Sequence, residues 1–428
     1  MSETSPSAAA ADWTEPARAI GERARHAARL LERAGPAART DALRAMAEGL
    51  REKAGTLQAD NEADLEGARQ AGLSKAMVDR LTLSPDRIEK MARSLEEVAD
   101  LRDPVGEVLE GYVRPNGLRI ERVRVPIGVV LTIYESRPNV TSDVAGLCLK
   151  SGNASVLRGG KESLRSNLAI HRVLADALTA TDLPADAVQM VDTPDRDLLA
   201  ALLRQDETID LVVPRGGEAL IRAVAEQATI PVIKHYKGVC HVYVDDLADL
   251  DMAEAICFNA KVQRPGVCNA METLLVHANV AARFLPRICR RLAEAGVELR
   301  GCERTRRHWP DAREATEDDW PAEYLDLVLA VRVVDGLEAA IEHIETYGSR
   351  HTDAIVTEDV RRIRRFVEGV DSSSVMVNAS TRFSDGGEYG LGAEVGISTD
   401  KLHARGPMGC RDLTTCKWVV TGNGHLRT

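Results

Sequence analysis

The sequence predicts an α/β protein made of two doubly wound domains in tandem, with a small additional β structure. Three observations lead to this fold class. The chain has 428 residues, more than one hydrophobic core usually supports. Short apolar runs alternate with helical segments along two separate stretches, which is typical of parallel sheets. Strand-like segments before the first stretch and after the second belong to neither series.

The first hundred residues are predicted to be helical. Ala, Leu, Arg and Glu recur at spacings of three and four between residues 14 and 101. A hairpin follows, because strand-like residues 108–113 and 118–123 flank a turn that contains Asn116 and Gly117. A hairpin needs an edge to pair with, and another subunit can supply one.

Two alternating series of strands and helices then predict the two sheets. The first series has strands at residues 128–133, 154–157, 187–191 and 209–213, separated by helices such as 164–180. The second has strands at 273–277, 327–333 and 353–356 and helices at 280–295, 336–346 and 359–368. Residues 412–420 are predicted to form a final strand.

Composition excludes several classes of function. With 44% hydrophobic and 28% charged residues, this is an ordinary globular chain. The 4% of aromatic residues and the net charge of −11 argue against nucleic-acid binding. The eight dispersed cysteines favour reduced thiols, and the scattered histidines predict no metal site. No signal peptide or membrane span is found, so the cytoplasm is the expected location.

Cys268 is the strongest candidate for a nucleophile. It lies in a short polar segment between an amphipathic helix and an apolar strand, near the junction of the two series. Gly266 permits a close backbone approach, and Lys261 and Arg264 are expected to provide positive potential that favours the thiolate. The alternative is a small buried hydrophobic residue, but the flanking residues favour the nucleophile.

Asn139 follows an apolar strand and precedes a helix, and two interpretations stay open. Its side chain can cap the helix or can donate a hydrogen bond to a carbonyl oxygen under attack.

Two glycine turns also follow predicted strands. Arg158, Gly159 and Lys161 place glycine and cations where phosphate groups bind, although Glu162 rules out a Walker A loop. Arg215, Gly216 and Gly217 open a helix that can receive a pyrophosphate, and a plain βα turn is an equal alternative. The usual G-x-G-x-x-G fingerprint is absent, which does not exclude dinucleotide binding.

A glycine-rich segment at residues 375–396 suits a loop wrapped around a ligand. Phe383, Tyr389 and Leu391 within it are expected to pack against other groups, which argues against a flexible surface loop.

Together these segments resemble the gamma-glutamyl phosphate reductases, a branch of the aldehyde dehydrogenase superfamily. The resemblance covers nearly the whole chain and is strongest at residues 134–141, 263–273, 347–353 and 378–399. It implies two tandem doubly wound α/β domains of aldehyde dehydrogenase type with a small β oligomerisation arm, and therefore a homo-oligomer. The implied limits are 1–104 and 126–262 for an NADP-binding domain, 263–408 for a catalytic domain, and 105–125 and 409–428 for the arm.

The resemblance also implies a reaction. Cys268 attacks L-glutamyl 5-phosphate, phosphate leaves, and NADPH reduces the thioester to glutamate 5-semialdehyde for proline biosynthesis. Asn139 and the backbone N–H of Cys268 stabilise the oxyanion. Hydrolytic relatives carry a glutamate base where this chain has residues 235–238, beginning with His235 and lacking that acid. This absence suits an enzyme that must not hydrolyse its thioester.

Site residues follow from the same resemblance. Lys161 stands where relatives carry an acid that binds a ribose hydroxyl, so the cofactor is expected to be NADPH. Glu323 matches an acid that contacts the nicotinamide ribose. The expected substrate contacts, for its carboxylate, amine or phosphate, are Ser136, Arg137, Ser380, Thr381 and Arg382.

Three alternatives remain at this stage. A related enzyme can use another acyl donor, such as an acyl-CoA. A cysteine hydrolase needs a histidine beside the thiol, which the sequence does not locate. The third is a scaffold or partner of glutamate 5-kinase, and a functional association with that kinase is also expected of an active enzyme.

Overall fold

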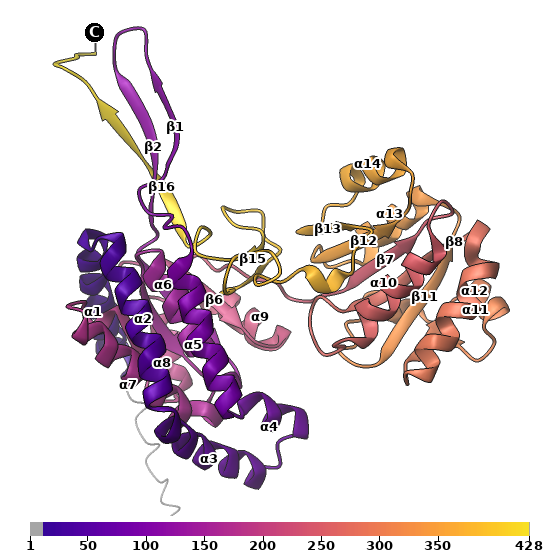
Figure 1. Cartoon of the computed structure of the whole chain (residues 1–428), viewed down its shortest axis with the longest axis horizontal. Helices are drawn as coiled ribbons and strands as arrows, with labels where there is room; N and C mark the ends of the chain where they lie inside the picture. Colours follow the sequence, from indigo (N-terminus) through magenta and orange to yellow (C-terminus); the bar gives the residue numbers. More distant parts are fainter. Residues whose placement is uncertain (1–11, 428) are drawn as a thin grey trace, which may run out of the picture. The chain divides into compact units, whose positions relative to one another are not determined.

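The computed structural model describes residues 12–427 and divides into two compact units (Figure 1). The first unit contains the described residues up to Ile233 together with Gly392–Val395 and the residues from Gly409 onward. The second contains Lys234–Leu391 and Gly396–Met408. Each unit has its own parallel sheet with helices around it, so the prediction of two tandem α/β domains is confirmed.

The first unit is built on a parallel sheet with strand order β5-β4-β3-β6. Its central strand, β3, is completely buried, which explains the continuous apolar run in the sequence. The strands are β3 (Val129–Tyr134), β4 (Ala154–Arg158), β5 (Val188–Met190) and β6 (Leu211–Arg215). The helices are α1 (Thr14–Arg33), α2 (Pro36–Glu52), α3 (Ala54–Gln70), α4 (Lys75–Leu81), α5 (Pro85–Asp100), α6 (Asn139–Lys150), α7 (Leu164–Ala180), α8 (Arg196–Leu202) and α9 (Glu218–Gln227).

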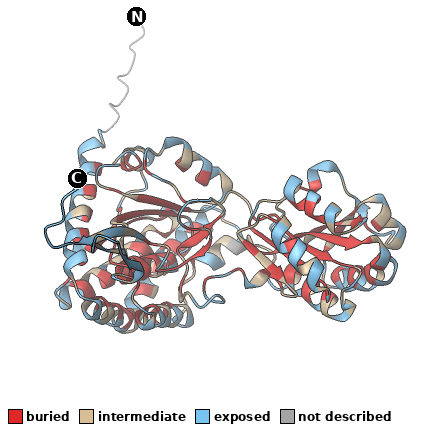
Figure 2. Ribbon diagram, turned by 90° about the horizontal axis from the view of Figure 1, so that it is seen from above, coloured by how far each residue is buried: buried red, intermediate tan, exposed pale blue. Residues whose placement is uncertain are grey.

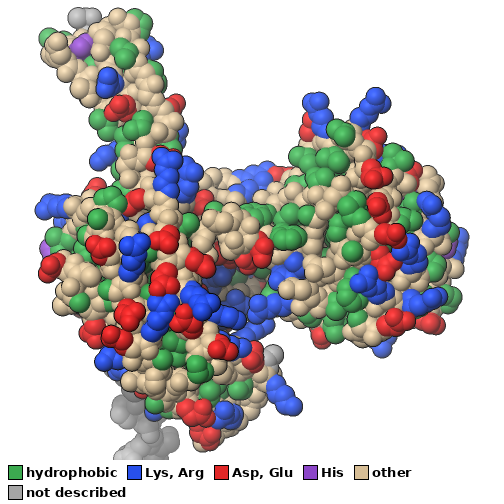
Figure 3. Space-filling view, viewed as in Figure 1, with side chains coloured by type: hydrophobic (Ala, Val, Ile, Leu, Met, Phe, Trp, Pro, Cys, Tyr) green, Lys and Arg blue, Asp and Glu red, His purple; other side chains and the backbone are tan. Residues whose placement is uncertain are grey.

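A three-stranded antiparallel sheet, here called the arm, extends from the first unit (Figure 1). It consists of β1 (Val108–Val113), β2 (Arg119–Pro126) and β16 (Thr414–Thr421), in the order β1-β2-β16. Apolar side chains such as Val113 and Trp418 are 65% and 54% exposed, and hydrophobic groups are visible along the arm in Figure 3. The hairpin and the final strand are therefore confirmed, while the role of the arm in oligomerisation remains a prediction.

The second unit has a seven-stranded parallel sheet with the order β10-β9-β11-β8-β7-β12-β13. Its strands are β7 (Cys240–Val244), β8 (Met271–His277), β9 (Glu298–Gly301), β10 (Arg313–Glu314), β11 (Val328–Val334), β12 (Thr352–Val356) and β13 (Ser374–Val377). The helices are α10 (Leu250–Val262), α11 (Ala278–Glu294), α12 (Glu303–His308), α13 (Leu337–Tyr347) and α14 (Val360–Gly369). A separate pair, β14 (Gly396–Ser398) and β15 (Gly406–Met408), is antiparallel.

Each face of this sheet is covered by helices. One apolar core contains Phe284 of α11 and residues of α10, and the other contains Phe366 of α14 and residues of α13. Figure 2 shows the buried residues concentrated on the strands within each unit. Among residues 12–427, no helix combines the length and apolar character needed to cross a bilayer.

The structure divides the chain at a different place from the predicted limits. The predicted limit of 126–262 includes the residues that form β7 and α10, but β7 pairs with β8 and β12 in the second sheet. An apolar strand carries no local signal of which sheet it joins, and only its partners decide this. The cofactor-binding and catalytic roles of the two parts remain predictions.

Candidate active site

Cys268 lies on the loop that connects α10 to β8, and its side chain is partly exposed. Behind this loop the backbone of Gly238 packs directly on the backbone of Cys268. A Cβ atom at position 238 would lie 1.9 Å from the Cys268 carbonyl oxygen, so only glycine permits this approach. The Cys268 thiol is therefore carried on a backbone that is tightly fixed from one side.

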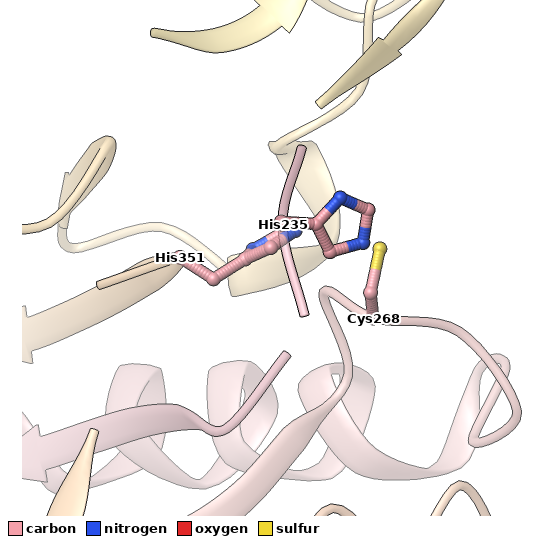
Figure 4. Close-up of side chains that lie close together, drawn as sticks. All are labelled: His235, Cys268 and His351. Carbon is pink, nitrogen blue, oxygen red and sulfur yellow. The ribbon is translucent and has the colours of Figure 1, made fainter. Parts of the chain in front are cut away.

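Two histidines surround the thiol. One ring nitrogen of His235, one of His351 and the sulfur of Cys268 lie within 4.8 Å of one another. Figure 4 shows the Cys268 sulfur beside the ring of His235. The rings of His235 and His351 meet edge to face, with centroids 5.3 Å apart. The fold therefore brings His235 beside Cys268, although 33 positions separate the two residues in the chain.

A second cysteine, Cys240, lies on the inner side of the loop. It is fully buried, and its thiol donates a hydrogen bond to the Cys268 carbonyl oxygen at 3.2 Å. Burial raises the pKa of Cys240 well above the usual range, which keeps this group a neutral thiol. Of these two cysteines, only Cys268 is therefore both accessible and suited to nucleophilic attack.

Lys261 does not provide the positive potential that the sequence suggested. Its Nζ forms an ion pair with Glu272 at 2.6 Å, and both side chains are completely buried. Burial lowers the pKa of Lys261 and raises that of Glu272 to about 7. The other oxygen of Glu272 accepts the Leu325 N–H at 3.1 Å. The pair therefore joins the end of α10 to the start of β8 and anchors both ends of the Cys268 loop.

Replacing Lys261 with methionine should destabilise the protein by about 3–5 kcal/mol, because Glu272 would be left buried without its counter-ion. Urea unfolding followed by circular dichroism measures this loss. Lys401→Met is the matched control, since Lys401 forms an exposed pair with Asp371 and its loss should cost less than about 1 kcal/mol. Equal losses in the two variants would contradict an anchoring role.

Two of the other predicted site residues also reach the Cys268 loop. Glu323 accepts a hydrogen bond from the Gly238 N–H at 2.8 Å, directly behind the nucleophile. Arg382 donates from Nε to the side chain of Gln263 at 2.8 Å, at the beginning of the loop. Burial and the neighbouring Arg264 lower the pKa of the Arg382 guanidinium. Glu323 thus contacts the residue that packs on Cys268, and Arg382 contacts the beginning of the Cys268 loop.

The other members of the C-terminal group are less accessible. The Ser380 hydroxyl accepts the Arg382 N–H at 3.3 Å, and Thr381 is completely buried. Phe383 and Tyr389 are 50% and 44% exposed, so the expectation that they pack closely against other groups was wrong. The Tyr389 hydroxyl is held by a hydrogen bond to Ser374 at 3.0 Å.

In the first unit, the predicted cofactor loops come together at one edge of the sheet. Lys161 follows β4, Ser136 follows β3, and Arg215 is the last residue of β6. These strands are adjacent and parallel, so their carboxyl ends lie side by side. The chain runs outward from β3 in one direction through β4 and β5 and in the other to β6. The strand order therefore reverses between β3 and β6, at their carboxyl ends. Such a topological switch point is where ligands bind in open α/β sheets.

Carboxylates cross-link these loops. Glu135 accepts the Gly217 N–H at 3.0 Å, and Glu162 accepts both the N–H and the hydroxyl of Ser136, at 2.9 and 2.5 Å. The N-terminus of α9 thus already holds an internal carboxylate where a pyrophosphate was expected. A Cβ on Gly216 would collide with this carboxylate, at 2.5 Å.

The cations of the cofactor loops differ in their surroundings. Arg215 is paired with Glu394 at 3.1 Å, and Arg158 donates to the Pro194 carbonyl at 2.9 Å. Lys161 is exposed, and Gly159 packs against Asn167 so closely that a Cβ would lie 2.0 Å from its amide nitrogen. Arg137 is also exposed.

Asn139 is not a helix cap. Helix α6 begins at Asn139 itself, the preceding Pro138 is in the cap position, and the helix has no side-chain cap. The Asn139 amide nitrogen donates instead to Asp143 at 2.9 Å. This hydrogen bond identifies the amide nitrogen of Asn139, because the Asp143 carboxylate only accepts. It uses one of the two amide N–H groups, so the second N–H can donate to a ligand. The role as a donor to an oxyanion remains a prediction.

Comparison with known proteins is consistent with this geometry. Residues 3–302 match the aldehyde dehydrogenase family. The gamma-glutamyl phosphate reductase of Moorella thermoacetica is 56% identical over 407 residues, covering 95% of this chain and 97% of that protein. That of Geobacter metallireducens is 55% identical over 413 residues, covering 96% and 99%. The crystal structure of gamma-glutamyl phosphate reductase from Thermotoga maritima superimposes with a TM-score of 0.94 at 48% identity, over 96% of this chain and 100% of that one.

Proposed function

This chain belongs to the gamma-glutamyl phosphate reductase family, a branch of the aldehyde dehydrogenase superfamily, and on that basis we propose that it reduces L-glutamyl 5-phosphate to L-glutamate 5-semialdehyde and phosphate, with NADPH as reductant and a thioester on Cys268. The observation that carries the proposal is the position of Cys268, a partly exposed thiol on a backbone fixed by Gly238. A fixed nucleophile beside polar groups is the arrangement that covalent acyl transfer requires.

The first half of the reaction forms the thioester. The Cys268 sulfur attacks the acyl carbon, the C–O bond to phosphate breaks, and phosphate leaves. The free N–H of the Asn139 amide donates to the oxyanion, a contribution of about 3 kcal/mol per donor in comparable sites. The hydrogen bond to Asp143 restricts the rotation of that amide.

The second half of the reaction reduces the thioester and regenerates free Cys268. Bound NADPH supplies the hydride that converts the thioester to the aldehyde, and the Cys268 thiolate is released. Glu323, which lies behind the nucleophile at Gly238, is suited to bind the nicotinamide ribose there. Arg382 is suited to bind an anionic group of the substrate, because its guanidinium touches the Cys268 loop. Ser136, Arg137, Ser380 and Thr381 remain weaker proposals for substrate binding.

The position of the predicted cofactor loops favours a dinucleotide in the first unit, although Glu135 already occupies the N-terminus of α9. The loops that carry Arg158, Gly159 and Lys161 and those that carry Arg215, Gly216 and Gly217 flank β3 at the carboxyl edge of the sheet, where nucleotides bind in this class of fold. Lys161 is the exposed cation suited to the extra phosphate of NADPH.

Lys161→Glu should lower the preference for NADPH over NADH by about tenfold or more, because a carboxylate repels the 2′-phosphate and accepts ribose hydroxyls. The ratio of kcat/KM for the two cofactors measures this. Lys90→Glu, which makes the same charge change on the exposed face of α5, should leave the ratio unchanged. An unaltered preference in Lys161→Glu would show that the phosphate binds elsewhere.

The proposed function is tested by the reverse reaction. Purified protein is given NADP and glutamate 5-semialdehyde, with and without phosphate, and NADPH is followed by its absorbance. Phosphate-dependent NADPH formation supports the proposal. Formation without phosphate contradicts it and indicates a hydrolytic dehydrogenase, and formation that requires coenzyme A indicates a different acyl donor.

Assembly into a homo-oligomer through the arm is part of the same proposal. The exposed apolar residues of β1 and β16 favour it, because a lone three-stranded sheet gains stability from further burial. Light scattering of the purified protein tests this, and a monomer at micromolar concentration would contradict it. The cytoplasmic location and the association with glutamate 5-kinase also remain proposals.

A further inference from the structure

The hydrogen bond between His235 and a backbone carbonyl decides the chemistry available at its ring. His235 Nδ1 lies 2.9 Å from the carbonyl oxygen of Ile397. A carbonyl oxygen only accepts, so Nδ1 carries a proton, and in the neutral ring the lone pair is on Nε2. Figure 4 shows the other side of this ring turned toward the Cys268 sulfur. The thiol thus faces an acceptor nitrogen rather than a donor.

The second histidine is placed differently. His351 is completely buried, and its Nδ1 lies 2.9 Å from the Thr352 hydroxyl and 3.7 Å from the sulfur of Cys240. Its ring packs edge to face against His235. These contacts give His351 a supporting position, whereas His235 is partly exposed and can exchange protons with a ligand in the site.

We propose that His235 is the acid–base partner of Cys268. This inference rests on the proposed function. Nε2 accepts the thiol proton as the sulfur attacks the acyl carbon, and the resulting imidazolium donates that proton to the phosphate oxygen as the C–O bond breaks. His235 is then neutral, the thioester has formed, and phosphate leaves protonated. After hydride transfer the released thiolate recovers a proton from solvent, so one proton is consumed in each turnover.

The charged groups near this pair are compatible with the proposal. Lys234, next to His235 in the chain, is paired with Asp400 at 3.3 Å. The Cys268 loop carries Arg264, and Arg382 interacts electrostatically with both Arg264 and Cys268. No carboxylate forms an ion pair with His235 in the part of the chain that is described.

Alkylation of Cys268 by iodoacetamide tests the pairing of His235 with Cys268, here called the dyad, without any substrate. Full-length wild type and His235→Gln are treated between pH 6 and pH 9.5, and mass spectrometry follows the peptide that contains Cys268. We expect His235→Gln to react about tenfold or more slowly at pH 7 and to approach the wild-type rate at pH 9.5, where hydroxide replaces the missing base. Turnover should fall by about 100-fold or more.

Two further variants make the result specific. His26→Gln changes an exposed histidine of α1 and should react like the wild type at every pH. In the smaller variant His235→Ala, added imidazole should restore part of the alkylation rate and the turnover, which it would not do for a structural defect. The proposal would be overturned if His235→Gln slowed the alkylation of Cys268 equally at pH 7 and pH 9.5. It would also be overturned if His351→Asn, and not His235→Gln, caused the pH-dependent loss of alkylation rate.

The two proposals fail separately in these experiments. If wild type shows no phosphate-dependent reaction while the alkylation profile depends on His235, the dyad stands and the substrate is wrong. If the wild type turns over normally and His235→Gln is alkylated at the wild-type rate, the substrate stands and the acid–base role is wrong.

Discussion

Cys268→Ser is expected to lower kcat by about four to six orders of magnitude, because a serine hydroxyl is a far weaker nucleophile than a thiolate and no thioester can form. NADPH binding should be nearly unchanged, because the substitution exchanges one small side chain for another in a partly exposed position. Turnover is measured by NADPH formation and cofactor binding by titration of NADPH fluorescence.

Cys302→Ser is the matched control. Cys302 is also partly exposed and forms no disulfide bond, but it precedes α12 and lies outside the Cys268 loop. Its replacement should leave turnover within a factor of two or so of the wild type. Comparable activity in Cys268→Ser and Cys302→Ser would remove Cys268 from the reaction.

Gly238→Ala is expected to lower kcat by about 100-fold or more without any change in a reacting group. The added Cβ would lie 1.9 Å from the Cys268 carbonyl oxygen and 2.6 Å from its Cα. Both partners are backbone, so the strain moves the nucleophile itself, and a displacement of about 1 Å is enough for a loss of this size. The measurement is kcat together with the thermal midpoint of unfolding.

Gly67→Ala provides the comparison for this variant. Gly67 lies in α3 with no atom within 4 Å of an added Cβ, so alanine should leave activity unchanged and stabilise the helix slightly. If Gly238→Ala retained the activity of Gly67→Ala, the loop would be more adaptable than its packing indicates.

The sequence predicted the larger elements of the fold because their signals are local. Helical periodicity located most helices within a few residues. Apolar runs located strands such as the completely buried β3, and the turn at Asn116 and Gly117 located the hairpin of β1 and β2. The assignment of β7 to the first domain failed because pairing with β8 is a tertiary property. The short strands β9 and β10 have too few residues to show a period.

The candidate site was predicted in the same uneven way. The local context of Cys268 identified an accessible thiol correctly. The prediction that Lys261 provides positive potential at the thiol was wrong, because the position of a charged residue in the chain does not reveal a buried partner such as Glu272. His235 was missed because it reaches Cys268 only through the fold. The resemblance did offer a signal, since it implies that His235 stands where hydrolytic relatives carry a glutamate base.

The arm also has a consequence for how the protein is made. Strand β16 pairs with β2 from Thr414 to Thr421, and the carbonyl of Leu413 accepts a hydrogen bond from the buried Asn153 side chain. The first unit therefore closes with residues that leave the ribosome after all of the second unit. During most of its synthesis the nascent chain has β1 to pair with β2 but not yet β16, so the second unit can complete its fold before the first.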